Sequence, residues 1–258
     1  MTYDKNTLFP YLIYNMPFPY SNHITVHPVT MNDIVLFQFL SPSIMVRKDS
    51  IFPRKDIIKM PYLTFLLQCF KDPSLELESK ITGLSEYYLH AVKLLGLCCK
   101  NAEIKFTSSM QLILNGEMIT PQIFDDLRRI ILLQNDIDFD IDAFLNKDTE
   151  QRLKKAREDQ QKHSQKASIE DYIDSLVIAM NTTEERIQNM TIRKFWRYVK
   201  RYQLYENYTF AKTGEYSGMV SFKEPIPHWM ASLDETDAYD QLKADENSLK
   251  GKLQNANN

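Results

Sequence analysis

The sequence predicts an α+β protein that is mostly helical, and three observations support this. Over several segments, apolar residues recur at intervals of three and four, which is the spacing of one buried helix face. One shorter stretch, 103–119, reads as β-strands around an Asn-Gly pair, a strong hairpin signal. Hydrophobic residues make up 43% of 258 residues, so the chain can bury one large core or two smaller ones, and we expect two.

The N-terminal part, 1–145, is expected to be an α+β domain. Helical patterns lie near 31–40, 55–70 and 85–98, with Pro61 in the first turn or at a kink of the second. The first thirty residues are rich in Pro, Tyr and Phe and have little periodicity. They predict an irregular arm, or a short edge strand around 24–27.

The hairpin signal continues into a helix. Segments 103–107, 110–114 and 117–119 predict a hairpin or three-stranded meander, because Asn115-Gly116 suits a type I′ turn in which both residues have positive φ. Thr120-Pro121 then opens a helix that runs through Gln134. Its inward residues are expected to be Phe124, Leu127 and Ile131.

Two polar segments divide the rest of the chain. Residues 146–167 predict a charged linker, because Leu153 and Ala156 are the only apolar residues of 147–166. Residues 168–232 predict a compact helical module. The end of the chain, 233–258, lacks an apolar stripe and predicts a flexible polar tail.

The module begins with two helix start signals. Ser168 and Asp171 predict an N-cap with a favourable charge near the positive helix end, and Thr182 with Glu185 has the spacing of a capping box. The first helix gathers its large apolar residues in one stripe: Ile169, Tyr172, Ile173, Leu176, Val177 and Met180.

The third helix of the module, from about Thr191, has an apolar side and a basic side. The apolar side holds Ile192, Phe195, Trp196, Val199 and Tyr202, and the other holds Arg193, Lys194, Arg197, Lys200 and Arg201. Basic helices can bind nucleic acid through phosphates. The net charge of −3 and the pI near 6.0 favour a solvated face instead, and nucleic acid is not expected as the partner.

Aromatic residues crowd the same region and indicate a protein interface. We expect Phe195, Trp196 and Trp229 to form a small core, and Tyr198, Tyr205 and Tyr208 to be partly exposed. The candidate partner-binding residues are Arg193, Arg197, Tyr198, Arg201, Tyr205 and Tyr208.

The sequence offers no catalytic constellation, so we expect no enzyme, cofactor or metal. Asp136, Asp138, Asp140 and Asp142 suggest calcium, but Ile141 stands where the loop needs Gly and Lys147 where it needs Glu. The phosphate-binding glycine motifs and the nucleophile elbow are absent from the sequence. The three cysteines predict small buried residues in a reducing compartment: Cys69, Cys98 and Cys99. With neither a secretion signal nor a membrane span in view, we expect a cytoplasmic protein.

The C-terminal half carries a family resemblance. PQIFDDLRRIILLQN (121–135), the polar connector, residues 168–202 and SGMVSFKEPIPHWM (217–230) together resemble tail-morphogenesis proteins of long-tailed bacteriophages. The resemblance is to tail assembly chaperones from phages of Gram-positive bacteria. It implies a non-enzymatic protein of the host cytoplasm that binds the tape-measure protein and helps tail-tube subunits assemble around it.

Alternatives to the chaperone stay open. The N-terminal α+β part is larger than such a chaperone needs, which leaves room for a structural tail or baseplate subunit of the virion. The order helix, short helix, basic helix also resembles a helix-turn-helix DNA-binding regulator in outline, although the third helix lacks a base-reading Asn or Gln near its start. Self-association into a homo-oligomer is a further option.

Overall fold

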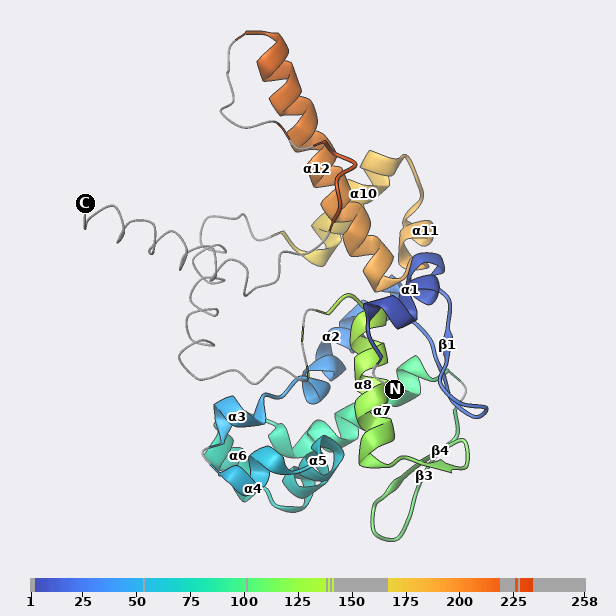
Figure 1. Cartoon of the computed structure of the whole chain (residues 1–258), viewed down its shortest axis with the longest axis vertical. Coiled ribbons are helices and arrows are strands. Elements are labelled where there is room, and N and C mark those ends of the chain that lie inside the picture. Colours follow the sequence, from blue (N-terminus) through green and yellow to red (C-terminus); the bar gives the residue numbers. More distant parts are fainter. Residues whose placement is uncertain are drawn as a thin grey trace, which may run out of the picture. The chain divides into compact units, whose positions relative to one another are not determined.

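The computed structural model describes residues 3–52, 54–100, 102–137, 139, 141, 167–218, 226 and 228–233. The chain divides into two compact units (Figure 1). Unit 1 comprises Met1–Glu150 and Ala167–Trp196, and unit 2 comprises Gln151–Lys166 and Arg197–Asn258. The predicted linker and tail lie almost entirely outside the described residues.

The described part is α+β and mostly helical, as the sequence predicts. Two small antiparallel sheets accompany the helices of unit 1. Its α-helices are α1 (Lys5–Tyr14), α2 (Ile34–Leu40), α3 (Lys48–Ile51), α4 (Lys55–Lys59), α5 (Tyr62–Lys71), α6 (Ser74–Ser79), α7 (Tyr87–Cys98), α8 (Pro121–Gln134), α10 (Ile169–Met180) and α11 (Glu184–Gln188). Short 3₁₀ turns cover Met31–Asp33, Ser41–Ile44 and Leu84–Glu86. Helix α12 (Ile192–Tyr216) contains the boundary between the units.

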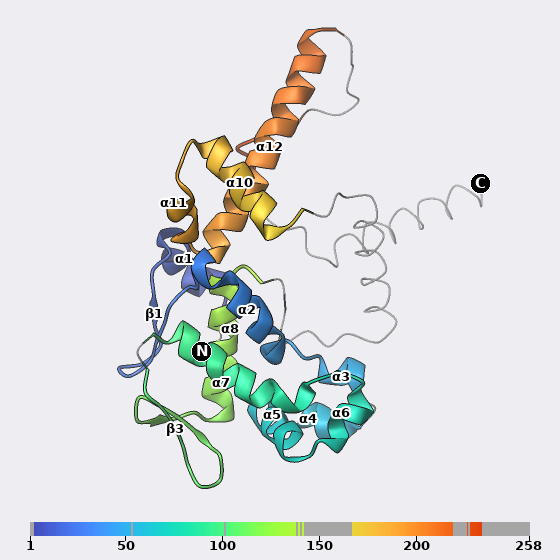
Figure 2. The ribbon, with the colours of Figure 1, turned by 180° about the vertical axis from the view of Figure 1, so that it is seen from behind.

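The core of unit 1 is built around α5, which packs against both α7 and α8 (Figures 1 and 2). Helix α2 packs against α7, and α1 against α8. The interior is aromatic: Phe52 and Phe65 meet edge to face at 5.7 Å, and Tyr62 stacks on Phe124 at 6.3 Å. These contacts bury the apolar stripes that the sequence shows on α5 and α8.

The predicted meander is confirmed. Strands β3 (Ile104–Phe106), β4 (Leu112–Leu114) and β5 (Glu117–Met118) pair antiparallel in that order. Asn115 and Gly116 have φ of 50° and 82°, as a type I′ turn requires. Thr120 then caps α8, because its hydroxyl accepts a hydrogen bond from the Ile123 amide at 3.2 Å.

Two buried side-chain amides at the C-terminal end of α8 form hydrogen bonds with backbone groups, some of them far away in the sequence. Asn135 Oδ1 accepts a hydrogen bond from the Val29 amide at 2.9 Å, and its Nδ2 donates to the Ile131 carbonyl at 2.8 Å. Gln134 Nε2 donates to the Val26 carbonyl at 3.1 Å. These side chains provide hydrogen-bond partners for backbone groups in the short strand β2 (Thr25–Val26) and just after it.

The prediction of an irregular arm at the N-terminus is wrong, because residues 5–14 form helix α1. Asp4 caps this helix, and Leu8 and Leu12, one turn apart, are buried. Tertiary burial of this pair outweighs the cost of Pro10 within the helix. The strand expected near 24–27 is confirmed as β2, which pairs with β1 (Phe18–Pro19).

The helix expected over 55–70 is two helices. Pro61 is the N-cap of α5, and Met60 before it is extended, with ψ of 139°. A residue that precedes proline is sterically driven out of the helical region, so α4 ends there.

The first two helices of the predicted C-terminal module form as expected, with one shift. Ser168 and Asp171 make a complete capping box at the start of α10. The cap of α11 is Thr183, whose side chain accepts from the Arg186 amide, and not Thr182 as the spacing had indicated. Both helices lie in unit 1 with the N-terminal elements.

Candidate functional site: helix α12

Helix α12 begins inside the core of unit 1. Ile192 and Phe195 are buried, which confirms their predicted place on the apolar side of this helix. Thr191 forms an antiparallel bridge with Thr30, and the Ile192 amide donates to the Val29 carbonyl at 2.9 Å. The first turn of α12 is therefore fixed by backbone pairing to a segment 160 positions earlier in the chain.

Arg193, one of the six candidate partner-binding residues, also belongs to this anchor. Its Nη1 donates to the Leu12 carbonyl at 3.0 Å, and its Nε lies 4.0 Å from Asp136 Oδ1. Its side chain is only 16% exposed. These contacts give Arg193 a structural part in unit 1, and its part in partner binding stays a prediction.

The other five candidates come together in unit 2. Tyr198, Arg201, Tyr205 and Tyr208 follow at steps of three, four and three residues, which places them along one face of α12. Arg197 lies one turn before Arg201 on the flank of that face. We name these five residues, Arg197, Tyr198, Arg201, Tyr205 and Tyr208, the α12 stripe.

Residues 228–231 of the same chain contact the α12 stripe. Arg201 Nη1 donates to the carbonyl oxygens of Trp229 and Ala231, the latter at 2.8 Å. The ring of Tyr205 meets Trp229 edge to face at 5.6 Å. The ring of Tyr208 meets His228 in the same manner at 5.0 Å. The stripe can thus hold a peptide segment through guanidinium-to-carbonyl hydrogen bonds and edge-to-face aromatic contacts.

Aromatic surface remains exposed beside these contacts. Tyr205 is 48% exposed, and Phe210 and Tyr216 farther along the helix are 76% and 83% exposed. Lys212 forms an ion pair with Glu215 at 2.8 Å and lies over the Tyr216 ring at 5.9 Å. The Tyr202 hydroxyl donates a hydrogen bond to Glu206, which raises the pKa of this phenol. Together these groups offer large apolar area with polar ends, as protein interfaces do.

Trp196 and Trp229 are intermediate in burial, so the small core predicted from Phe195, Trp196 and Trp229 is not formed as such. Phe195 is buried in unit 1 and Trp229 belongs to unit 2. Trp196 packs edge to face on Tyr172 and Phe195 at 5.2 and 5.1 Å. The spacing alone could not show that a unit boundary separates them.

We next consider metal ligands, cysteines and membrane-spanning helices among the described residues. Within that part of the chain, His, Cys, Asp and Glu form no group of three that could hold a metal ion. Three of the four aspartates that suggest calcium lie outside it, and the fourth, Asp136, faces Arg193. All three cysteines are buried and reduced, as expected, and burial raises the pKa of Cys69 and of Cys99 to about 12. A search of the described helices finds none with the length and hydropathy that a bilayer crossing requires.

Comparison with known proteins gives one match. Residues 159–234 match the family model described as the YomV second domain. Neither a curated protein nor a solved structure matches the chain. The matched range contains α10, α11 and α12 together with the segment that contacts the α12 stripe. This domain family is phage-associated, so the similarity supports a bacteriophage protein in general.

Proposed function

We propose that this protein is a non-enzymatic assembly factor of phage tails that binds the tape-measure protein through the α12 stripe. The observation that carries the proposal is the ladder of tyrosine and arginine side chains on one face of α12, within the phage-associated domain. The resemblance of the C-terminal half to tail assembly chaperones supplies the identity of the client.

The chemistry of the α12 stripe suits a long client protein that must be bound reversibly. Tyrosine rings give contact area to apolar side chains at low cost in conformational entropy, and their hydroxyl groups stay hydrated. Arg197 and Arg201 can pair with carboxylates on the surface of a helical client. Many such weak contacts, repeated along a chain, give retention together with easy release.

The segment 228–231 competes for the same side chains. A client that contacts Arg201, Tyr205 or Tyr208 must either displace this segment or bind the α12 stripe next to it. Arg201 therefore also holds segment 228–231, so its substitution would remove both this contact and the proposed contact with the client. Arg197 and Tyr198 precede Arg201 on the helix, so substituting them tests the stripe while the contacts of Arg201, Tyr205 and Tyr208 with the segment stay in place.

The position of the first turns of α12 weighs against the DNA-binding alternative. In a helix-turn-helix protein, the N-terminal residues of the recognition helix contact the bases. Here Ile192 and Phe195 are buried and Arg193 is engaged with Leu12 and Asp136. That end of the helix is therefore occupied by contacts within unit 1.

The proposal is tested by co-expression of the full chain with the tape-measure protein of the same phage. Arg197→Glu together with Tyr198→Ala should reduce co-purification at least about tenfold, because both remove contacts at the stripe. Lys93→Glu is the matched control, since it reverses one exposed positive charge in unit 1.

Unchanged capture by the double variant, with normal thermal unfolding, would remove the stripe from the mechanism. Salt-sensitive binding of duplex DNA by the wild-type chain would favour the regulator instead. Detection of the protein in purified particles by mass spectrometry would favour a structural virion subunit.

A further inference from the structure

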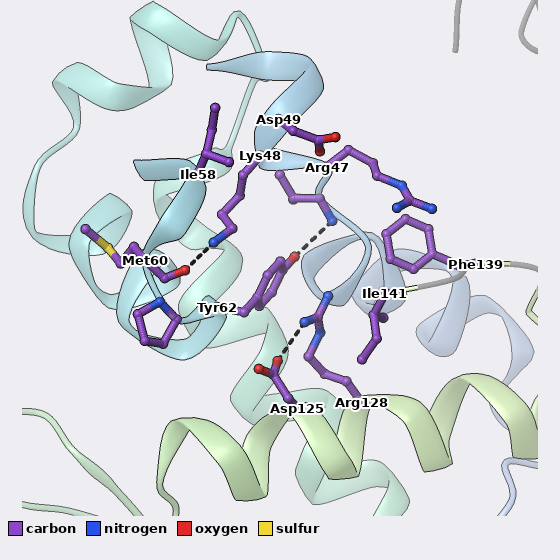
Figure 3. A pocket seen from close by; sticks show the side chains of 12 residues that line it. Arg47, Lys48, Asp49, Ile58, Met60, Tyr62, Asp125, Arg128, Phe139 and Ile141 are labelled. Atoms are coloured by element: carbon purple, nitrogen blue, oxygen red, sulfur yellow. Dashed lines mark hydrogen bonds and ion pairs between the residues drawn. The ribbon is translucent and has the colours of Figure 1, made fainter. Parts of the chain in front are cut away.

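A cavity of about 230 Å³ lies in unit 1 where α3, α4, α5 and α8 meet (Figure 3). Its polar wall contains Lys48 and Asp49 from α3, Tyr62 from α5 and Arg128 from α8. Its apolar wall contains Ile58 and Met60. The cavity is smaller than a site for a drug-sized molecule, so it fits only a small ligand or the end of a chain.

Arg128 is a fixed element of this wall. Its side chain is buried, its Nε and Nη2 donate to the Ile44 carbonyl at 3.1 and 2.8 Å, and its Nη1 pairs with Asp125 at 2.8 Å. The guanidinium also stacks on the Tyr62 ring at 3.4 Å. Tyr62 is itself held, because its hydroxyl donates to the Ser43 carbonyl and accepts from the Val46 amide, both at 2.9 Å.

Lys48 differs from Arg128 because its ammonium has no carboxylate partner among the described residues. It donates to the Met60 carbonyl (Figure 3). It also lies over the Phe65 ring at 5.8 Å. Burial, followed by the charge of Arg128, lowers the pKa of Lys48. The charges of Asp125 and Asp49 oppose this shift in part. Within the described residues, the ammonium donates a hydrogen bond to a neutral carbonyl and to no carboxylate, so it gains more from an anion than a solvated surface lysine does.

Asp49 supplies the complementary group. Its Oδ2 is buried and accepts no hydrogen bond from any residue that the structure describes. A buried carboxylate oxygen normally has a donor, so this atom favours a ligand that carries an N–H group. The cavity lining holds Arg47, Lys48 and Arg128 against Asp49 and Asp125, one positive charge in excess.

We propose that this cavity binds a small α-carboxylate with a neighbouring N–H group, with Lys48 as its cationic anchor and Asp49 as the acceptor. A free amino acid and the C-terminal residue of a peptide both have this chemistry. The carboxylate lies toward Lys48, the N–H toward Asp49, and a short apolar side chain toward Ile58 and Met60. This site is in unit 1 and is independent of the function proposed for α12.

Four probes with the same apolar side chain, each titrated into the full-length protein and followed by NMR or calorimetry, test the ligand chemistry. L-Leucine represents the free amino acid, and N-acetyl-leucine represents a chain end. Leucinamide lacks the carboxylate, and 4-methylpentanoate lacks the N–H group. We expect saturable binding of leucine or N-acetyl-leucine, and at least about tenfold weaker binding of the other two, since a charged hydrogen bond is lost. Preference for leucine identifies the free amino acid, and preference for N-acetyl-leucine identifies a chain end.

Two lysine variants test the anchor. Lys48→Met keeps the aliphatic stem and should weaken binding at least about tenfold, whereas Lys59→Met, on the exposed side of α4, should leave it unchanged. The proposal is overturned if leucinamide binds as well as the tighter of leucine and N-acetyl-leucine, if none of the four probes saturates, or if the two lysine variants behave alike. The first two results come from the wild-type protein, so they do not depend on the folding of a variant.

Discussion

Phe195 and Phe210 stand fifteen positions apart on the same helix and have opposite environments. Phe195, in unit 1, is 0% exposed, and Phe210, in unit 2, is 76% exposed. Val199 is the only buried apolar residue among those described for unit 2, whereas the other buried apolar residues of the described part belong to unit 1. Aromatic residues thus have different roles at the two ends of α12. In unit 1 they stabilise the core, and in unit 2 they form exposed surface that a partner can contact.

Polar groups differ between the units in the same way. In unit 1, Asn135 and Arg128 are buried and bind backbone atoms far away in the sequence. In unit 2, ion pairs such as Lys212 with Glu215 are local and lie on the surface. Local surface pairs contribute little to stability, so the stability of the described protein should come from unit 1.

The largest contrast should come from truncating the two phenylalanines. Phe195→Ala should lower the free energy of unfolding by about 3–5 kcal/mol, because it leaves a cavity in the core. Phe210→Ala should change it by less than about 0.5 kcal/mol, because the ring is mostly in water. Chemical denaturation of each variant measures both values. Equal changes in the free energy of unfolding for the two variants would show that aromatic residues contribute equally to stability in both units.

A second contrast concerns polar side chains within unit 1. Asn135→Ala removes the acceptor of the buried Val29 amide and should cost about 1–3 kcal/mol. Asn32→Ala removes only an exposed hydrogen bond to Asn189, at 3.3 Å, and should have a much smaller effect. Denaturant midpoints measured on both variants decide the point. An unchanged free energy of unfolding in Asn135→Ala would show that the hydrogen bond to the buried Val29 amide does not contribute to stability.

The smallest effect is a pH dependence at Glu76. Hydrogen bonds from the Ser85 hydroxyl and from the Gly83 and Ser85 amides lower the pKa of this carboxyl group. Because the folded pKa is lowered, the stabilisation is fully present above the unfolded value of about 4.3 and is lost as the pH falls through the folded pKa.

Glu76→Gln should therefore be less stable than wild type at neutral pH, and the difference should vanish in acid. Ser85→Ala removes the largest cause, so it should move the pKa of Glu76 back toward its ordinary range. NMR titration of the Glu76 side chain measures this directly. The same pKa in wild type and in Ser85→Ala would contradict the assignment.

Local signals in the sequence predict several elements correctly. The Asn115-Gly116 turn, the Thr120 cap and the Ser168 capping box each depend on residues within a few positions of one another. The apolar side of α12 is also right for Ile192, Phe195 and Val199, because three- and four-residue spacing needs no knowledge of the fold.

What the sequence does not predict depends on distant partners. Helix α1 has a proline and only two buried leucines, so its stability comes from packing against α8. Arg193 is indistinguishable by spacing from Arg197 and Arg201, yet Leu12 and Asp136 engage it. The cavity combines Lys48, Tyr62 and Arg128, which no short motif connects.

The bridge between Thr30 and Thr191 has a consequence for biosynthesis. Unit 1 includes residues up to Trp196, so its N-terminal portion completes its contacts only after that residue has been translated. Domains usually fold as units when their last residues leave the ribosome. The final assembly step of this unit therefore follows the synthesis of Trp196, and the aromatic end of α12 emerges shortly afterwards.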